Sequence, residues 1–547
     1  MKYMRRVVLF VFVPLMLIVT GCGGCGDQLA GPGESCDMEL DEACENGDEQ
    51  LECITDDDGT DRCLRPVGTR CDSDGDADNC EPDTACKTDS EGDERCLIDE
   101  AANCDPDDNL CADGFACEEL EDGDYGCYQP LTIQGSVFDA ETEEAIEDAH
   151  VIAFDEERSA LSDVAVTDED GDYSMSVPAM RGEDGEPVQQ FFTLRASAQD
   201  YQTFPGGIRE AQPIDASDFS EDDDQWVIDT SQTDVALIEL PADERGHAHI
   251  RGTVDIDGGL GGVLVVAEPD DIDDHEEQDS ATGISAVSGL DGSFTIFNVP
   301  DDSYDVRGFL ADYQIEPEEV TMDDENIDDL VLTEADDGPT DVSGNLQIVR
   351  TEGATSVLLM VASTFDPTSN RGETPAGLRA PKTGEGDISG DWTIEGVPAG
   401  EYVAVAAFEN DDLVRSLDEG IAGTDLVYFE VNSEDDEFAI GESFKVTSAL
   451  ETFGPGAEGP EGVSERPTLR WGSLSNADWY DVIVYDAFGN LVFEETDIEH
   501  SGGQNEYTAE YDGDFEEGMY YQFRATAHRA DSAVTSTEFL RGVFYAE

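Results

Sequence analysis

Apolar and polar residues alternate along most of the chain after residue 130. Leu131, Ile133 and Val137 fall on one side of a period of two, and Thr132 and Gln134 fall on the other. This spacing is typical of a strand with one buried face. Similar short runs, separated by turns, continue to the C-terminus. The pattern predicts a mainly β fold of tandem antiparallel β-sandwiches, preceded by a small disulfide-rich N-terminal region.

One turn-and-strand pattern occurs three times. A glycine turn leads into an alternating strand at Gly171, and the segments Gly292–Tyr304 and Gly390–Tyr402 repeat it without a gap. Glycine suits such turns because it readily adopts positive φ. The spacing predicts three sandwich repeats, over residues 131–245, 246–338 and 339–451. We interpret the aromatic residue two positions after each glycine as core, in preference to a sugar-stacking role: Tyr173, Phe294 and Trp392.

The order of these features resembles the carboxypeptidase regulatory-like domain. In that family a glycine turn, an alternating strand, a Val-Pro pair and a tyrosine follow one another. Here Val299-Pro300 leads to Tyr304, and Val397-Pro398 leads to Tyr402. The family has a transthyretin-like β-sandwich of the carbohydrate-binding-like superfamily, so the resemblance implies that fold and a binding role. The first copy departs from the pattern, because an acidic insertion after Val177-Pro178 delays its next strand.

The last part of the chain predicts a fourth sandwich. Residues 452–465 are rich in Gly and Pro and are interpreted as a linker. Residues 466–547 resemble a fibronectin type III-like domain, with an early tryptophan at Trp471, a Tyr480-Asp-Val482 strand and a turn–tyrosine–strand near Tyr521. The resemblance implies a β-sandwich with Trp471 in its core.

The N-terminus predicts export and lipidation. An apolar run of 13 residues, Val7–Val19, follows a basic start. It is too short to span a bilayer, which needs about 20 residues, but suits a signal peptide. Val19-Thr20-Gly21-Cys22 resembles the lipobox of bacterial lipoproteins, whereas a plain secretory signal is the alternative. The resemblance implies a signal peptide over residues 1–21, a lipidated tether over 22–35, and a lipid bilayer as partner of acylated Cys22. Because Gly23 and not aspartate follows, it implies an outer-membrane lipoprotein of the cell envelope, facing the periplasm or the surface.

All 14 cysteines lie before residue 128, and twelve of them form three sets of four within residues 36–130. The last two of each set enclose nine residues, which predicts three hairpin modules with two disulfides each. Zinc is the competing interpretation, but CxxC pairs are missing from the sets and the compartment is oxidising. The connectivity stays open, and Cys25 is left as an odd thiol. The predicted disulfide cysteines are Cys36, Cys44, Cys53, Cys63, Cys71, Cys80, Cys86, Cys96, Cys104, Cys111, Cys117 and Cys127.

One acidic stretch suggests calcium. Asp72, Asp74, Asp76 and Asp78 alternate in a way that resembles the calcium loops of thrombospondin type 3 repeats, and carboxylate oxygens suit that ion. Gly75 falls at the fourth place, not the sixth, and such strings arise by chance in an acidic chain. We therefore expect no obligatory cofactor, with calcium as the one candidate.

The charge balance excludes some partners. With 26 basic and 132 acidic residues the net charge is −106. Removal of Lys2, Arg5 and Arg6 with the signal leaves −109. A field of this sign repels nucleic acid and anionic head groups. A salt-adapted acidic surface is the favoured explanation, ahead of a specific cation-binding role.

No catalytic motif stands out from the sequence. HExxH, GxSxG, SxxK and Walker patterns do not occur. We therefore expect a non-catalytic envelope lipoprotein, built as an extended rod, that presents its sandwiches to carbohydrate or an extracellular protein in an adhesion-like role. The alternatives are a structural spacer, or a scaffold or regulatory subunit of an envelope enzyme or secretion complex, including a peptidase.

Overall fold

The structure is a computed structural model. It describes residues 35–36, 44, 51–55, 60–71, 80–88, 94–98, 101–105, 110–112, 114–182, 184–222, 225–256, 261–270, 272, 278, 280–323, 325–335, 337–382, 386–408, 411–420, 422–432, 437–530 and 532–546. The predicted lipidation site Cys22 and the calcium candidates Asp72, Asp74, Asp76 and Asp78 lie outside these residues. The chain divides into two compact units, Met1–Glu118 with Gly123–Gln129, and Glu119–Asp122 with Pro130–Glu547.

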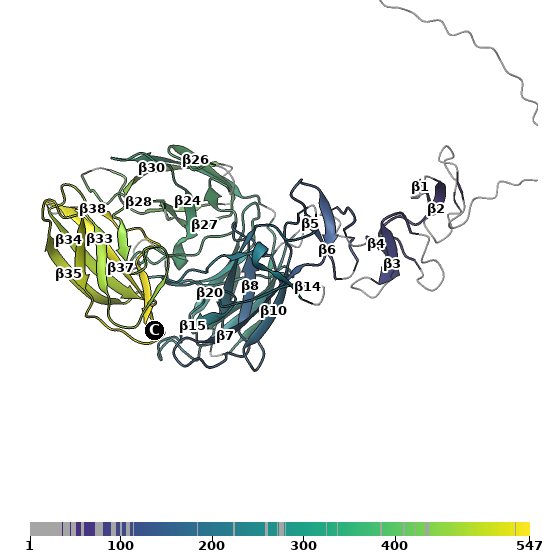
Figure 1. Ribbon diagram of the computed structural model, residues 1–547, viewed down its shortest axis with the longest axis horizontal. Helices are drawn as coiled ribbons and strands as arrows, with labels where there is room; N and C mark the ends of the chain where they lie inside the picture. The colour runs from purple at the N-terminus through teal and green to yellow at the C-terminus, as the bar shows by residue number, and fades with distance from the viewer. Residues whose placement is uncertain are drawn as a thin grey trace, which may run out of the picture. The chain divides into compact units, whose positions relative to one another are not determined.

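The N-terminal unit contains three short antiparallel hairpins (Figure 1). Their strands are β1 (Glu52–Thr55) with β2 (Asp61–Leu64), β3 (Thr84–Thr88) with β4 (Glu94–Ile98), and β5 (Ala116–Glu119) with β6 (Tyr125–Tyr128). In each set of four cysteines the first bonds the third and the second bonds the fourth. The six disulfides are Cys36–Cys53, Cys44–Cys63, Cys71–Cys86, Cys80–Cys96, Cys104–Cys117 and Cys111–Cys127.

In this connectivity the two cysteines that face each other in a hairpin do not bond each other. Cys53 lies opposite Cys63, and Cys86 lies opposite Cys96, yet each bonds a cysteine from the segment before its hairpin. The two disulfides of a module therefore join the two cysteines that precede the hairpin to its two strands, one to each strand. Each closes a loop with a sequence separation of 13 to 19 residues, which stabilises by about 3 kcal/mol in the chain-entropy account. These modules have few apolar residues, so the disulfides replace a large core.

The C-terminal unit begins with a sandwich of two sheets. One sheet has the order β10-β7-β14-β13, with β15 also on β7, and the other has the order β12-β11-β8-β9. Their strands are β7 (Leu131–Asp139), β8 (His150–Phe154), β9 (Ala165–Val166), β10 (Asp172–Val177), β11 (Phe191–Ser197), β12 (Ile214–Asp215), β13 (Ser220–Asp222), β14 (Gln225–Asp229) and β15 (Val235–Leu237). The short 3-10 helix η1 (Ala216–Asp218) follows β12.

The second and third sandwiches repeat this plan. The second pairs the sheet β19-β16-β22 with β18-β17-β20-β21, and the third pairs β26-β23-β30-β28 with β25-β24-β27-β29. The strands of the second are β16 (Ala248–Asp255), β17 (Leu264–Pro269), β18 (Ile284–Val287), β19 (Ser293–Val299), β20 (Ser303–Phe309), β21 (Glu318–Thr321) and β22 (Ile327–Thr333). The strands of the third are β23 (Thr340–Ile348), β24 (Val357–Val361), β25 (Arg379–Ala380), β26 (Asp391–Val397), β27 (Gly400–Ala406), β28 (Leu413–Arg415), β29 (Val427–Val431) and β30 (Glu437–Ser448). The 3-10 helix η3 (Ala362–Thr364) follows β24.

All three repeats share one strand order. The opening strand lies between the strand that follows the glycine turn, which runs antiparallel to it, and later strands that run parallel to it. In the second repeat these are β19 and β22 on the two sides of β16. The other strand pairs within these repeats are antiparallel.

Each opening strand also pairs a glycine with the aromatic residue after the turn. The opposed pairs are Gly135 with Tyr173, Gly252 with Phe294, and Gly344 with Trp392. A Cβ on Gly344 would lie 2.3 Å from Trp392 Cζ2, and one on Gly252 would lie 2.8 Å from Phe294 Cζ. The glycines therefore make room for the rings, all three of which are buried as core residues.

The turn glycines are less uniform. Gly171 and Gly292 have φ of +79° and +77°, as expected for tight turns. Gly390 does not have a positive φ, so the expectation of a left-handed glycine is wrong in the third repeat. A Cβ at Gly390 would meet no atom within 4 Å.

The last sandwich extends further than the sequence predicts. It pairs the sheet β31-β33-β36 with β32-β39-β37-β34-β35, with β38 also on β37. The strands are β31 (Thr452–Gly454), β32 (Glu461–Val463), β33 (Thr468–Gly472), β34 (Trp479–Asp486), β35 (Leu491–Glu499), β36 (Glu506–Glu510), β37 (Tyr520–Arg529), β38 (Ser532–Ser536) and β39 (Val543–Ala546). The interpretation of residues 452–465 as a linker needs correction, because β31 and β32 are edge strands of this sandwich. Gly and Pro are tolerated there because edge strands have unpaired backbone groups.

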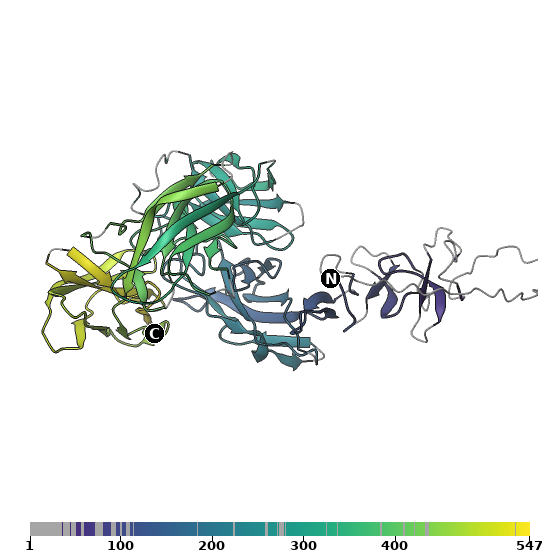
Figure 2. The same ribbon diagram turned by 90° about the horizontal axis from the view of Figure 1, so that it is seen from above.

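The sandwiches of the C-terminal unit pack on one another. Leu264, Val266 and Phe309 of the second sandwich lie in the same hydrophobic cluster as the core of the third. In Figure 2 the green strands of the third repeat lie against the teal strands of the second. The first sandwich contacts the fourth, since Gln202 Nε2 donates to Ala487 O at 2.7 Å. The expectation of a rod of successive modules is therefore wrong within this unit, because buried apolar surface holds non-neighbouring sandwiches together.

Candidate functional site: an arginine-lined cavity

A large cavity lies where the four sandwiches of the C-terminal unit meet. Its volume is about 980 Å³. Its described lining comes from the β8–β9 loop and β11 of the first sandwich, β17 and β18 of the second, the segment after β24 in the third and the β34–β35 turn of the fourth. The arginines among these lining residues are Arg158, Arg195, Arg209 and Arg371.

Arg195 on β11 joins three sandwiches. Its side chain is 7% exposed, and its guanidinium donates to Glu373 Oε1 at 2.8 Å and to Ser285 Oγ at 3.0 Å. Ser285 in turn donates to Glu373 at 3.0 Å. Burial by itself would raise the pKa of Glu373, but the charge and hydrogen bond of Arg195, with the charge of Arg158, outweigh it and lower the pKa. Glu373 is therefore held ionised against a buried cation.

The charge of Arg371 is likewise compensated by a carboxylate. It donates to Glu210 Oε1 at 2.7 Å, which links the third sandwich to the first. Its other terminal nitrogen donates to Phe539 O of the fourth sandwich at 3.0 Å. The guanidinium also lies 5.3 Å from the centre of the Phe408 ring. A cation over an aromatic face adds about 0.5–2 kcal/mol, so this side chain is fixed in place.

Arg209 lies between two aromatic rings. Its guanidinium is 4.7 Å from the centres of both Phe204 and Tyr520, and one terminal nitrogen donates to Ala236 O. Burial lowers the pKa of Arg209 to about 10, against the opposing effect of Tyr520. Arg209 thus stays charged at neutral pH, but the rings hold it in the wall of the cavity.

Arg158 differs from the other three arginines. Its side chain is exposed, and within the described part of the chain its guanidinium has no hydrogen-bond or ion-pair partner. Desolvation by the surrounding protein nevertheless lowers its pKa, while the charges of Glu373 and Arg195 act in opposite directions. Because Arg158 lines the cavity and its side chain is exposed, the side chain projects into the cavity. It is the cation that a ligand in the cavity could reach.

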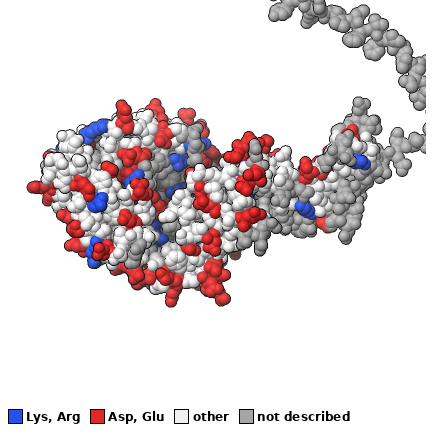
Figure 3. Space-filling view, viewed as in Figure 1, with Lys and Arg blue, Asp and Glu red and all other residues white. Residues whose placement is uncertain are grey.

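The cavity is far less acidic than the rest of the chain. Its described lining has four arginines and seven carboxylates, whereas the whole chain has 26 basic and 132 acidic residues. Among the charged side chains, Asp and Glu cover more of the face seen in Figure 3 than Lys and Arg do, and basic side chains border the hollow between the sandwiches. The lining acids are Asp155, Glu156, Glu210, Asp243, Glu244, Asp366 and Glu373.

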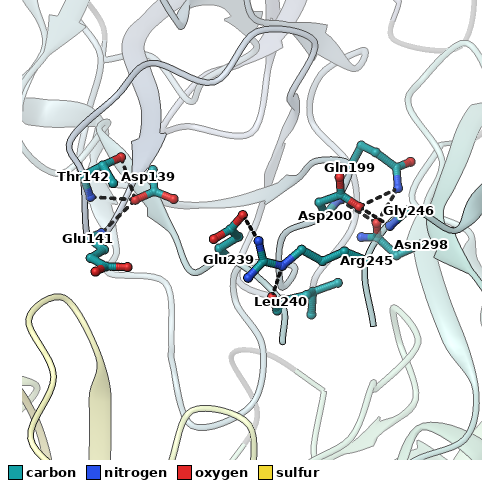
Figure 4. Close-up of polar contacts among 10 residues, drawn as sticks. All are labelled: Asp139, Glu141, Thr142, Gln199, Asp200, Glu239, Leu240, Arg245, Gly246 and Asn298. Carbon is teal, nitrogen blue, oxygen red and sulfur yellow. Dashed lines mark hydrogen bonds and ion pairs between the residues drawn. The ribbon is translucent and has the colours of Figure 1, made fainter. Parts of the chain in front are cut away.

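A network of polar contacts positions one rim of the cavity (Figure 4). Arg245 pairs with Glu239 and donates to Leu240 O, which fixes the segment that carries Asp243 and Glu244. Asp200 Oδ1 accepts from Gly246 N at 2.6 Å.

The same network joins the first two sandwiches. Asn298 Oδ1 on β19 accepts from Asp200 N at 2.6 Å and from Gln199 Nε2 at 2.7 Å. The amide nitrogen of Asn298 donates to Ala198 O and Tyr201 O, both at 3.2 Å. One side chain of the second sandwich thus makes four hydrogen bonds to the first. Figure 4 draws those from Gln199 and Asp200.

The residues singled out in the sequence do not form this cavity. The twelve cysteines form the disulfides, and among the described residues the only groups of three metal-ligand atoms within 4.8 Å are sets of these bonded cysteines. No helix in the described part of the chain has the length and apolarity needed to cross a bilayer.

Sequence reasoning missed the cavity arginines. They are separated by up to 213 positions, from 158 to 371, and belong to no motif. The one signal in the sequence is the scarcity of basic residues, 26 in the whole chain, which makes each arginine worth locating.

No protein-family model and no curated protein matches the chain. Solved structures to which it shows similarity include the Bacillus anthracis TIE protein, at 10% identity over 72% of this chain and 65% of that one, with a TM-score of 0.13. The chain thus spans less than two thirds of that protein. A minor pilin of Streptococcus agalactiae has 14% identity over 38% of this chain and 99% of the pilin, with a TM-score of 0.17. The major pilin subunit of Bacillus cereus has 11% identity over 58% of this chain and 100% of the pilin, with a TM-score of 0.15. Similarities this low support no statement about the function of this chain.

Proposed function

We propose that this chain is a non-catalytic lipoprotein of the cell envelope that binds a saccharide in the cavity between its four sandwiches. The observation that supports the proposal is the cavity itself. At about 980 Å³ it is at the upper end of the range of small-ligand pockets, about 300–1,000 Å³. A structural spacer needs no such cavity, so the geometry favours a binding role over the scaffold alternative.

The lining suits a ligand with many hydroxyl groups. Carboxylates accept hydrogen bonds and guanidinium groups donate them. The charged lining residues can therefore pair with sugar hydroxyls that act as donors and with those that act as acceptors. Among the lining phenylalanines, Phe154 and Phe408 are buried in hydrophobic clusters, whereas Phe488 is partly exposed. The Phe488 ring offers apolar contact for the C–H face of a sugar ring.

A glycan array tests the binding role. We would screen the full-length chain in detergent, with calcium and with chelator. Ala281 is an exposed lining residue, and Ala281→Trp should occupy part of the cavity and abolish saccharide binding. The matched control is Gly502→Trp, because a side chain at this exposed glycine meets nothing within 4 Å. Equal binding by both variants would place the ligand elsewhere, and no binding by any form would reject the saccharide proposal.

The envelope location depends on Cys22. We expect Cys22→Ala to lose incorporation of labelled fatty acid in cells, whereas Cys25→Ala should retain it. Retained labelling of Cys22→Ala would show that another residue carries the lipid, and absence of labelling in the native chain would show that the stretch before Cys22 is a plain secretory signal.

A further inference from the structure

Arg158 differs from the other lining arginines in how its charge is compensated. Around it, Arg195 is paired with Glu373 and Arg371 is paired with Glu210. Arg209 is held between Phe204 and Tyr520. In the described lining, Arg158 is therefore the arginine whose exposed side chain makes no hydrogen bond, whereas the unpartnered nitrogens of Arg209 and Arg371 are buried.

The backbone holds Arg158 in position before any ligand arrives. It lies in a turn between β8 and β9, where Asp155 Oδ1 accepts from the backbone nitrogens of Glu157 at 2.9 Å and Ser159 at 2.8 Å. Arg158 N donates to Asp155 O at 3.2 Å, and Arg158 has a φ of +67°. A turn fixed by its own hydrogen bonds reduces the ordering entropy lost when a ligand binds.

We propose that the saccharide held by this cavity carries a carboxylate, as a uronic acid does, and that Arg158 binds that carboxylate. This inference rests on the proposed function of the preceding subsection. A guanidinium presents parallel N–H groups that match the two oxygens of a carboxylate. A neutral sugar would leave those donors without a charged partner in a partly desolvated site, which is unfavourable.

The other lining charges favour a single carboxylate over a phosphate. Seven described acidic residues surround the cavity, and two of them neutralise Arg195 and Arg371. A phosphate near neutral pH has close to two negative charges and would meet stronger repulsion from the remaining acids than a monoanion would. The hydroxyls of the same sugar can donate hydrogen bonds to those acids.

Calorimetric titration of the full-length chain in detergent tests the inference. The probes are oligomers of galacturonic acid, the same oligomers with methyl-esterified carboxyls, neutral galactose oligomers and galactose 6-phosphate. The variants are Arg158→Gln and Arg158→Lys. Arg470→Gln is the matched control, because Arg470 is an exposed arginine of the last sandwich that pairs with Glu506. Arg158 makes no side-chain hydrogen bond to lose, so the variants should fold.

We expect galacturonate oligomers to bind the native chain and Arg470→Gln equally. Hydrogen bonds to charged groups contribute about 1.5–3 kcal/mol, so Arg158→Gln should bind about 10- to 100-fold more weakly. The affinity of Arg158→Lys should fall between those of the native chain and Arg158→Gln, because lysine keeps the charge but not the paired N–H groups of the guanidinium. Esterification should weaken binding to the native chain by a similar factor and have little further effect on Arg158→Gln.

The opposite outcomes separate this inference from the proposed function. Equal binding of neutral and acidic oligomers, unchanged by Arg158→Gln, would overturn the carboxylate assignment and leave a saccharide site in place. Tighter binding of the sugar phosphate than of the uronate would also overturn it. If none of the saccharides binds, the proposed function fails and this inference fails with it.

Discussion

Glu373 accepts hydrogen bonds from Arg195 of the first sandwich and Ser285 of the second while it belongs to the third. Its pKa lies below the ordinary value of 4.5 despite burial, because Arg195 and Arg158 favour its ionised form. A lowered carboxyl pKa stabilises the fold above the ordinary value, and that stabilisation is lost as the pH falls below about 4.5. Acid in this range should therefore loosen this junction.

We expect Glu373→Gln to lower the free energy of unfolding by about 2–4 kcal/mol, because it leaves Arg195 as a buried, unpaired cation. Chemical denaturation at pH 7 measures the change. Glu319→Gln, at an exposed position of β21, should change stability by less than about 0.5 kcal/mol. If the two variants were equally stable, the ion pair would contribute nothing to the junction.

His150 is a second titratable contact between sandwiches. Its ring lies edge-on to Phe297 of the second sandwich, with 5.0 Å between ring centres. Burial first, then the charges of Arg251 and His249, lowers the pKa of His150 from 6.5 to about 4, although Asp148 acts in the opposite direction. The folded state therefore favours the neutral ring.

Stability should then fall as the pH drops from about 6.5 to 4, since the unfolded chain binds the proton first. The loss due to His150 is at most about 3 kcal/mol. Proton-detected NMR of the ring should show a midpoint near pH 4, and His150→Gln should flatten the stability curve over this interval. A midpoint near 6.5 would contradict the expectation.

At the scale of elements, a glycine on each opening strand allows an aromatic ring to lie across it. Gly344 and Trp392 show the tightest approach, with the added Cβ at 2.3 Å from the ring. We expect Gly344→Ala to lower the stability of the third sandwich by about 1–3 kcal/mol through overpacking. Thermal unfolding measures this loss.

A second substitution identifies the cause. Trp392→Leu should cancel part of the effect of Gly344→Ala, because the smaller side chain removes the clash. Gly390→Ala is the matched control, since that position is open and has no positive φ. Equal losses from both glycine variants would show that the ring contact is not the cause.

Most of the strands could be predicted from the sequence. Period-two alternation predicts β7 and β10, and the aligned turns predict β19 and β26. The edge strands β31 and β32 were missed because Gly and Pro reduce intrinsic strand propensity. Pairing with β33 and β39 overrides that propensity, and only the folded sandwich supplies those partners.

At the scale of the whole molecule, the sandwiches share cores as well as contacts. Phe309 lies on β20 of the second sandwich but is fully buried in the cluster of the third, edge-on to Tyr402 with 6.0 Å between ring centres. The two sandwiches should therefore unfold together.

We expect Phe309→Ala to lower stability by about 3–5 kcal/mol, as for other large buried rings. Differential scanning calorimetry should show one shifted transition for both sandwiches. Val331→Ala, at a side chain 46% exposed on β22, should leave the profile nearly unchanged. A shift of one transition with a second left in place would show that the sandwiches unfold independently.

The sequence by itself determined the properties that depend on local order. Alternation specified a β fold, cysteine spacing specified disulfide hairpins, and the Gly-to-aromatic repeats specified successive sandwiches, because period, spacing and turn chemistry act over a few residues. The tertiary structure alone decided the disulfide pairing, the packing of the first sandwich on the third and fourth, and the cavity that contains Arg158. These depend on contacts between residues hundreds of positions apart, such as Gln202 with Ala487 and Arg209 with Tyr520. No local pattern encodes such contacts, since they arise only when separate apolar faces are buried against one another.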